Sequence, residues 1–198
     1  MRQQHRSGSG YSFIELAFTL GIVATVGATA VPQTVSSVDA YRAAAAARYL
    51  SGRMQRARME AVARSAEVAL RFSDTGAGYE FATFLDGNRN GVLTHDILRG
   101  IDPELGAPER LADNFPGVDF GVLPGLPPVD SGGTPPGSDP LKLGASNILA
   151  FSAVGTSSSG SVYILGRRRN QFVIRVYGET GKTRVLKFNR SLNQWLPL

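Results

Sequence analysis

The sequence contains no cysteine and only two histidines among its 198 residues. The lack of cysteine excludes disulfide bonds, thiolate metal sites and cysteine nucleophiles. His95 is the only histidine beyond the first ten residues, and no motif places a serine beside a base, so we expect no enzyme. Charged residues make up 19% and hydrophobic residues 42%, which is too apolar for a disordered chain and too mixed for a polytopic membrane protein. This composition predicts one globular domain with an anchor.

The N-terminal region combines a short basic start with a long apolar run. Arg2, His5 and Arg6 precede residues 13–31, which have about the length needed to cross a bilayer. The basic side is expected to stay in the cytoplasm. Glu15 is the only charged residue of the run, and a carboxylate there costs about 2.5–3.5 kcal/mol on insertion scales. Something must therefore compensate for its charge.

Two interpretations of this region compete. The first is an ordinary secretory signal peptide cut after the small residues 28–30, which would release an exported soluble β domain. The second is based on residues 10–15, Gly-Tyr-Ser-Phe-Ile-Glu, which resemble the prepilin signal. That resemblance implies cleavage by prepilin peptidase between Gly10 and Tyr11 and methylation of the new N-terminus. It also implies that Glu15 serves assembly by pairing with the N-terminal amine of a neighbouring subunit.

Residues 39–64 are rich in alanine and arginine and contain no proline. Apolar residues recur there at helical spacing, which predicts an amphipathic helix continuing outward from the apolar run: Ala47, Leu50, Met54, Ala57 and Ala61. Charged residues mark another face, for which solvation is the simplest account: Arg53, Arg56, Glu60 and Arg64. Pro32, between the two stretches, either bends the helix or closes the membrane segment.

Beyond residue 66 the hydrophobic period changes from helical to alternating. Residues 67–72 and 79–85 predict a β-hairpin around a turn at 74–78. Residues 100–144 hold nine of the eleven prolines and predict a long insertion between strands, with one short strand-like piece at 118–122. Further short segments predict an antiparallel sheet, with Trp195 as a core anchor near the end: 148–151, 161–165, 172–177 and 184–188.

A prepilin signal, a long helix containing residues 55–61, a hairpin, and a strand-rich end with Phe151 and Gly155 together resemble the GspH/FimT family. The resemblance implies an α+β, type IV pilin-like fold, in which a long N-terminal helix, transmembrane in its first part, packs on an antiparallel β-sheet or β-sandwich domain. The expected parts are a prepilin leader, a transmembrane helix segment, a periplasmic amphipathic helix and a β-rich globular domain: 1–10, 11–32, 33–65 and 66–198.

The same resemblance implies a function in assembly. We expect a minor pseudopilin subunit of a type II secretion system, which assembles through its N-terminal helix into the periplasmic pseudopilus and contributes to protein secretion. A minor type IV pilin involved in pilus assembly or DNA uptake is the alternative. The expected partners are prepilin peptidase, other pseudopilins or pilins, and the inner-membrane assembly platform. The expected location is the bacterial inner membrane, crossed once, with the C-terminal domain in the periplasm.

Residues 86–92 resemble a calcium loop, with side-chain oxygens at alternate positions and a glycine for the sharp turn. The candidate ligands are Asp86, Asn88, Asn90, Val92 through its carbonyl, and Asp96. Ile97 stands at the last loop position, where an acidic residue is usual, and the two asparagines reduce the charge that would hold the ion. A turn built on Asx side chains is therefore the alternative, and no other cofactor is expected.

Basic residues near the C-terminus suggest DNA as a partner. The net charge is +5, and some type IV members of the family that assist DNA uptake carry a glycine, basic, any, arginine motif, matched here by Gly181, Lys182 and Arg184. A second basic turn could add phosphate contacts: Arg167, Arg168 and Arg169. Solvated hairpin tips are the simpler account of both. The first turn also resembles a P-loop, but no helix follows it to receive a phosphate, so we predict a hairpin turn there.

Overall fold

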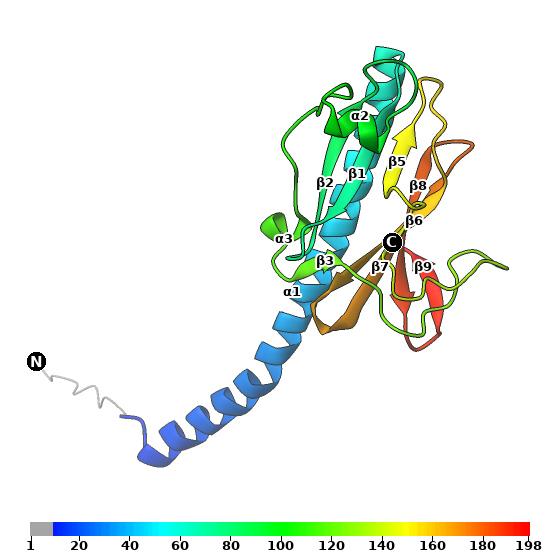
Figure 1. Ribbon diagram of the computed structural model, residues 1–198. Helices are drawn as coiled ribbons and strands as arrows, with labels where there is room; N and C mark the ends of the chain where they lie inside the picture. The colour runs from blue at the N-terminus through cyan, green and yellow to red at the C-terminus, as the bar shows by residue number, and fades with distance from the viewer. Residues whose placement is uncertain (1–9) are drawn as a thin grey trace, which may run out of the picture. The chain divides into compact units, whose positions relative to one another are not determined.

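The computed structural model describes residues 10–198, with the backbone alone for residues 29–32 (Figure 1). The basic residues Arg2, His5 and Arg6 and the rest of the expected leader before Gly10 lie outside the described residues. The chain divides into two compact units, Met1–Val38 and Asp39–Leu198, and each is described by itself.

Helix α1 (Phe13–Arg64) is 52 residues long and contributes to both units. Pro32 lies within its bounds, so this proline does not terminate the helix. The C-terminal end is closed by Ser65 in the left-handed conformation, with φ 51°. The Ser65 N–H donates to the Val62 carbonyl at 3.3 Å and the Ala66 N–H to the Ala61 carbonyl at 3.2 Å, the two bonds of a Schellman cap.

The second unit contains two antiparallel sheets. The first has the order β2-β1-β5 and contains the predicted hairpin, with Phe72 opposite Phe81: β1 (Val68–Asp74), β2 (Tyr79–Leu85) and β5 (Ile148–Phe151). The second has the order β3-β6-β7-β8-β9, with β4 also paired to β6: β3 (Val118–Phe120), β4 (Leu141–Lys142), β6 (Gly160–Gly166), β7 (Asn170–Tyr177), β8 (Lys182–Asn189) and β9 (Gln194–Pro197). The predicted hairpin is therefore confirmed. Of the segments predicted for the C-terminal sheet, 161–165, 172–177 and 184–188 form it, whereas 148–151 pairs with β1 in the first sheet, and β4 and β9 were not expected.

The proline-rich segment 100–144 is an insertion between β2 and β5 that is fastened to both sheets. It follows the short helix α2 (Thr94–Leu98), includes α3 (Leu111–Asn114), and supplies β3 and β4 to the second sheet. Its first part runs along the free edge of β2, where Phe81 bridges Glu109. This segment thus covers an edge that would otherwise expose unpaired backbone groups.

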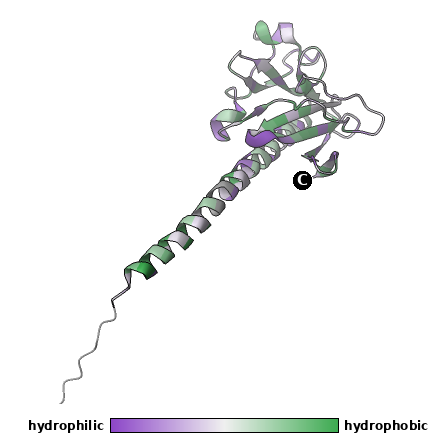
Figure 2. Cartoon of the chain, turned by 90° about the horizontal axis from the view of Figure 1, so that it is seen from below, coloured by the Kyte–Doolittle hydropathy of each residue, from purple (hydrophilic) through white to green (hydrophobic). Residues whose placement is uncertain are grey.

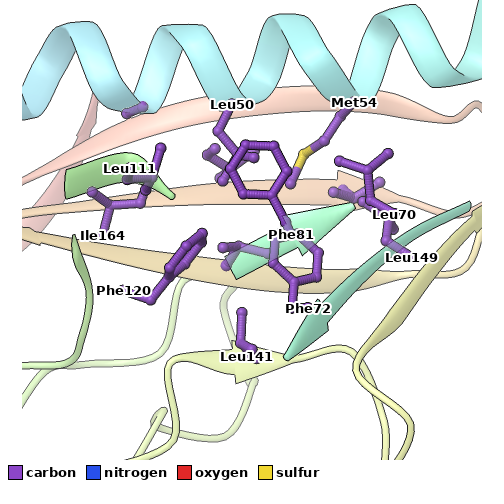
Figure 3. Close-up of a cluster of buried hydrophobic side chains, with 14 of the residues drawn as sticks. Leu50, Met54, Leu70, Phe72, Phe81, Leu111, Phe120, Leu141, Leu149 and Ile164 are labelled. Carbon is purple, nitrogen blue, oxygen red and sulfur yellow. The ribbon is translucent and has the colours of Figure 1, made fainter. Parts of the chain in front are cut away.

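The buried face of α1 packs on the sheets through the predicted stripe. All five predicted positions are at most 2% exposed: Ala47, Leu50, Met54, Ala57 and Ala61. Figure 3 shows Leu50 and Met54 pointing from the helix into a cluster that includes Phe81 and Leu70. The helix comes close enough to β6 that a Cβ at Gly166 would lie 2.6 Å from the Ala43 Cβ. The expected α+β fold, a long N-terminal helix on antiparallel sheets, is confirmed.

A second, smaller cluster lies on the other face of the six-stranded sheet. Side chains alternate along β6 and β7, so Val162 and Ile174 face the helix whereas Tyr163 and Val173 face away from it. The insertion covers this second face. Trp195 packs there, half-buried, and its Nε1 donates to the Pro127 carbonyl at 3.1 Å. The predicted anchor therefore holds the insertion to the sheet and does not lie in the main core.

Candidate assembly and binding sites

The first half of α1 is apolar and exposed. Figure 2 shows its N-terminal turns in the colour of hydrophobic residues, and this stretch is long and apolar enough to cross a membrane. Large side chains point outward around its circumference: Phe13, Ile14, Phe18, Leu20, Ile22 and Val23. A helix that is apolar on all sides is stable only in apolar surroundings, either lipid or other helices.

The predicted processing and assembly residues lie at the start of this helix. Gly10 and Tyr11 precede α1 and belong to no helix or strand, and the Tyr11 side chain is 79% exposed. Glu15 stands in the first turn, where a carboxylate is favoured by the helix dipole. It takes part in none of the ion pairs found within residues 10–198. Any cation that compensates for Glu15 must therefore come from outside the described part of this chain.

Polar side chains of α1 hold the loop between β5 and β6 and the turn between β7 and β8. Arg58 Nε donates to the Gly155 carbonyl at 2.8 Å, and Gln55 Nε2 donates to the Gly181 carbonyl at 3.2 Å. A Cβ at Gly181 would lie 2.5 Å from the Gly155 oxygen and 2.8 Å from Arg58 Nε. Gly181, with φ 60°, is therefore needed for packing. The helix phrase 55–61 and Gly155, which carried the family resemblance, meet at this contact.

The two groups of candidate DNA-binding residues lie at opposite ends of β7. Lys182 and Arg184 are exposed on β8, next to the β7–β8 hairpin turn. The second group forms the turn η1 (Arg167–Arg169) before Asn170, roughly 20 Å away at about 3.3 Å per strand residue. The structure therefore does not gather them into one patch. The turn that resembled a P-loop is the predicted hairpin turn.

Two carboxylates that the sequence did not single out hold basic side chains, Asp39 in a buried position and Glu109 in a partly buried one. Asp39 of α1, with a side chain 7% exposed, pairs with Arg168 at 3.5 Å and Arg42 at 3.9 Å. Arg168 of the basic turn is therefore bound to the helix. Glu109 pairs with Arg53 at 2.6 Å, so Arg53 does not belong to a solvated face as expected. Arg168 and Arg53 are each more than forty residues away from the carboxylate that they contact, so sequence spacing could not predict these two ion pairs.

The loop proposed for calcium is held by hydrogen bonds among its own groups. The Asp86 carboxylate accepts backbone N–H bonds from four residues, at 2.7–3.2 Å: Asn88, Arg89, Asn90 and Gly91. Asp96 Oδ2 accepts from the side-chain amides of Asn90 at 3.0 Å and Asn88 at 3.3 Å, and these bonds, led by that from Asn90, lower the Asp96 pKa. The Val92 N–H donates to Glu67.

This arrangement is that of an Asx-rich turn. Within residues 10–198, no group of three or more histidine, cysteine or acidic side chains is placed to hold a metal ion. Calcium at Asp86, Asn88, Asn90, Val92 and Asp96 stays a prediction.

Comparison with known proteins gives one match. The family model described as type II transport protein GspH matches residues 46–181, from the buried half of α1 to the β7–β8 turn. No curated protein and no solved structure matches the chain.

Proposed function

Because the chain belongs to the GspH family of type II transport proteins, we propose that it is a minor pseudopilin of a type II secretion system. In this proposal the subunit assembles through its N-terminal helix into the periplasmic pseudopilus, together with other pseudopilins, and so contributes to protein secretion. The family is structural, and the function proposed here is assembly without catalysis. The family match over 46–181 and the residues of the prepilin signal support it.

The observation that carries the proposal is the exposed apolar half of α1 with a single carboxylate in it. Before assembly, this stretch holds the subunit in the inner membrane, and the β domain lies in the periplasm. In the filament, the same stretch packs against like helices, where the N-terminal amine of a neighbour compensates for Glu15. A carboxylate without a partner in apolar surroundings costs free energy. The subunits therefore pack with the one axial offset that brings Glu15 next to the amine of its neighbour.

Processing by prepilin peptidase precedes assembly. Cleavage between Gly10 and Tyr11 creates the amine that pairs with Glu15 of another subunit, and it removes the basic leader that would otherwise stay at the cytoplasmic surface. The inner-membrane assembly platform then moves the subunit from the bilayer into the filament. The exposed position of Tyr11, outside any helix or strand, is compatible with access by a protease.

The test is the intact mass and N-terminal sequence of the protein extracted from membranes of its native host. We expect a methylated chain that begins at Tyr11. A Gly10→Val variant should retain the leader, whereas Gly27→Val, a change of the same size within the helix, should still be processed. A soluble chain that begins at Val31 would instead identify a secreted β domain and overturn the proposal.

Lys182 and Arg184 favour a second candidate function, a minor type IV pilin that binds DNA. Both side chains are exposed, and neither takes part in an ion pair within the described residues. The Lys182→Glu/Arg184→Glu variant should then lower DNA affinity at least tenfold and flatten its salt dependence, as loss of phosphate contacts requires. The exposed pair Arg48→Glu/Arg99→Glu, which likewise takes part in no ion pair within the described residues, is the matched control. Equal DNA affinity of both variants would exclude this function.

A further inference from the structure

A polar cavity of about 280 Å³ lies between the six-stranded sheet and residues 129–135 of the insertion. Its floor consists of side chains from three neighbouring strands: Lys142 of β4, Ser161 and Tyr163 of β6, and Arg175 of β7. The cavity is on the sheet face that looks away from α1, because Val162 and Ile174, which alternate with these residues, pack in the main core.

The strand register places two cations in one row across the sheet. Lys142 is opposite Ser161, and Ser161 is opposite Arg175, so Ser161 lies between the two cations on the same face. The row extends by a third cation, because Arg184 of β8 lies directly opposite Arg175. Such a row is destabilising unless an anion lies close to it. The positive row predicts that this face holds a negative group.

In the free chain that group is Asp130 of the insertion. Its Oδ2 lies 2.7 Å from Arg175 Nε, while Arg175 Nη1 donates to the Gly160 carbonyl at 3.0 Å. The guanidinium also stands 5.6 Å above the Tyr177 ring. Arg175 is thus held in place by β6 and β7, with its side chain only 23% exposed, before any ligand arrives. Lys142 is less restrained and pairs with Asp139 at 3.4 Å.

Asp130 is the weaker member of this pair. Its side chain is 42% exposed, and it belongs to a segment without helix or strand that contains Gly132 at φ 75° and Gly137 at φ 66°. An ion pair as exposed as this one shifts an equilibrium by at most about fivefold. The acidic group of another molecule can therefore replace Asp130 while Arg175 remains in place.

We infer that this cavity is a binding site for an aspartate or glutamate side chain of a partner protein, and that Asp130 occupies it as an internal substitute until the partner binds. Arg175 supplies the Nε donor that Asp130 releases, Lys142 a second positive charge, and the Ser161 and Tyr163 hydroxyls additional donors. One Arg175 nitrogen is already used by Gly160, so the donors suit a singly charged carboxylate better than a phosphate dianion. This inference does not depend on the membrane helix or on the machine that the subunit serves.

The experiment is a binding titration of the detergent-solubilised full chain with a fluorescent peptide of sequence Gly-Ser-Asp-Ser-Gly and its Asn counterpart. We expect the chain to bind the Asp peptide more tightly than the Asn peptide. Asp130→Asn should tighten binding of the Asp peptide by up to about fivefold, because the Asp130–Arg175 pair that competes with the peptide shifts the equilibrium by at most about that factor. Asp113→Asn, a change of the same charge on an exposed residue, should have no effect.

Removal of the cations should have the opposite effect. Arg175→Gln should reduce the ratio of the affinities for the two peptides to below twofold. Lys142→Gln should lower the affinity for the Asp peptide severalfold. Arg99→Gln is the exposed control, and fluorescence of the single tryptophan, Trp195, reports whether each variant folds. Equal affinity for both peptides in the Asp130→Asn variant would overturn the inference. If the cavity bound inorganic phosphate and not the Asp peptide, its ligand would belong to another class, and the inference would again be overturned.

Discussion

The two halves of α1 use apolar residues in opposite ways. Before Val38, large apolar side chains lie all round the helix and are exposed, and Glu15 is the only charged residue. From Asp39 onward, most apolar residues form one stripe that is buried against the sheets, the charged residues lie at other positions, and Tyr41, Met59 and Val62 are exposed. The two halves therefore differ both in hydropathy and in how apolar residues are distributed around the helix axis.

This difference indicates where each half obtains its stability. The second half is stabilised within the chain, through the contacts of its buried stripe, at about 25 cal/mol per Å² of apolar surface. The first half has no such contacts within the described residues and must obtain them from lipid or from other subunits. A substitution in the first half should thus change assembly without changing folding, and a substitution in the second half should do the reverse.

Glu15→Ala gives the strongest test of this separation. We expect the variant to fold and to stay in the membrane, since removing a carboxylate favours insertion by about 2.5–3.5 kcal/mol. Capture of partner subunits, measured by co-purification, should fall more than tenfold, because the neighbour's amine loses its counter-charge in apolar surroundings. Thr19→Ala, one turn further along, is the control and should assemble normally. If subunits carrying Glu15→Ala still assembled into a filament, the hypothesis that Glu15 pairs with the amine of a neighbour would be wrong.

Met54→Ala and Met59→Ala make the same change on the two faces of the second half. Met54 is fully buried in the main core, whereas Met59 is 64% exposed. We expect Met54→Ala to lower the free energy of unfolding by about 2–5 kcal/mol and Met59→Ala by less than about 0.5 kcal/mol. Denaturation of the full chain followed by Trp195 fluorescence measures both. Equal effects would mean that the stripe does not stabilise the domain.

Much of this organisation could be predicted from the sequence because it depends on local periodicity. The buried stripe, the hairpin and most of the C-terminal strands follow from spacing alone, as Leu50 and Phe72 illustrate. The contacts that could not be predicted join residues far apart in the chain. Asp130 and Arg175 are 45 residues apart, and no periodic pattern relates a residue of a proline-rich insertion to one within a strand. Strand β4 was missed because two residues are too short for any period.

Glu109→Gln tests how the insertion is fastened to the buried half of α1. Glu109 pairs with Arg53 at 2.6 Å and accepts a hydrogen bond from the Tyr49 hydroxyl, which is the main reason that the Tyr49 pKa is raised. The amide cannot neutralise Arg53, so we expect a loss of about 1–3 kcal/mol at neutral pH. Glu104→Gln, an exposed position of the same segment, is the control and should cost under about 0.5 kcal/mol.

The same variant changes the response to alkaline pH. A tyrosine whose pKa is raised by folding contributes stability below its unfolded value, about 10, and this contribution disappears as the pH rises through the folded pKa. Spectrophotometric titration of the wild-type chain should therefore show a Tyr49 transition that moves to lower pH in Glu109→Gln. An unchanged titration would show that Glu109 does not control this hydroxyl.

Gly52→Ala gives the smallest effect, and its comparison with Gly166→Ala locates the contact between helix and sheet. Gly52 lies on the exposed face of α1 with open space where a Cβ would stand, so alanine should stabilise the domain by about 0.5–1 kcal/mol through its higher helix propensity. Gly166 has an ordinary φ of −94°, but its added Cβ would lie 2.6 Å from Ala43 and should cost about 1–3 kcal/mol. The two substitutions add the same methyl group, so the sign of each effect reports whether there is space for it, with helix propensity adding to the gain at Gly52. If both stabilised the domain, the close approach of α1 to β6 at Ala43 would be wrong.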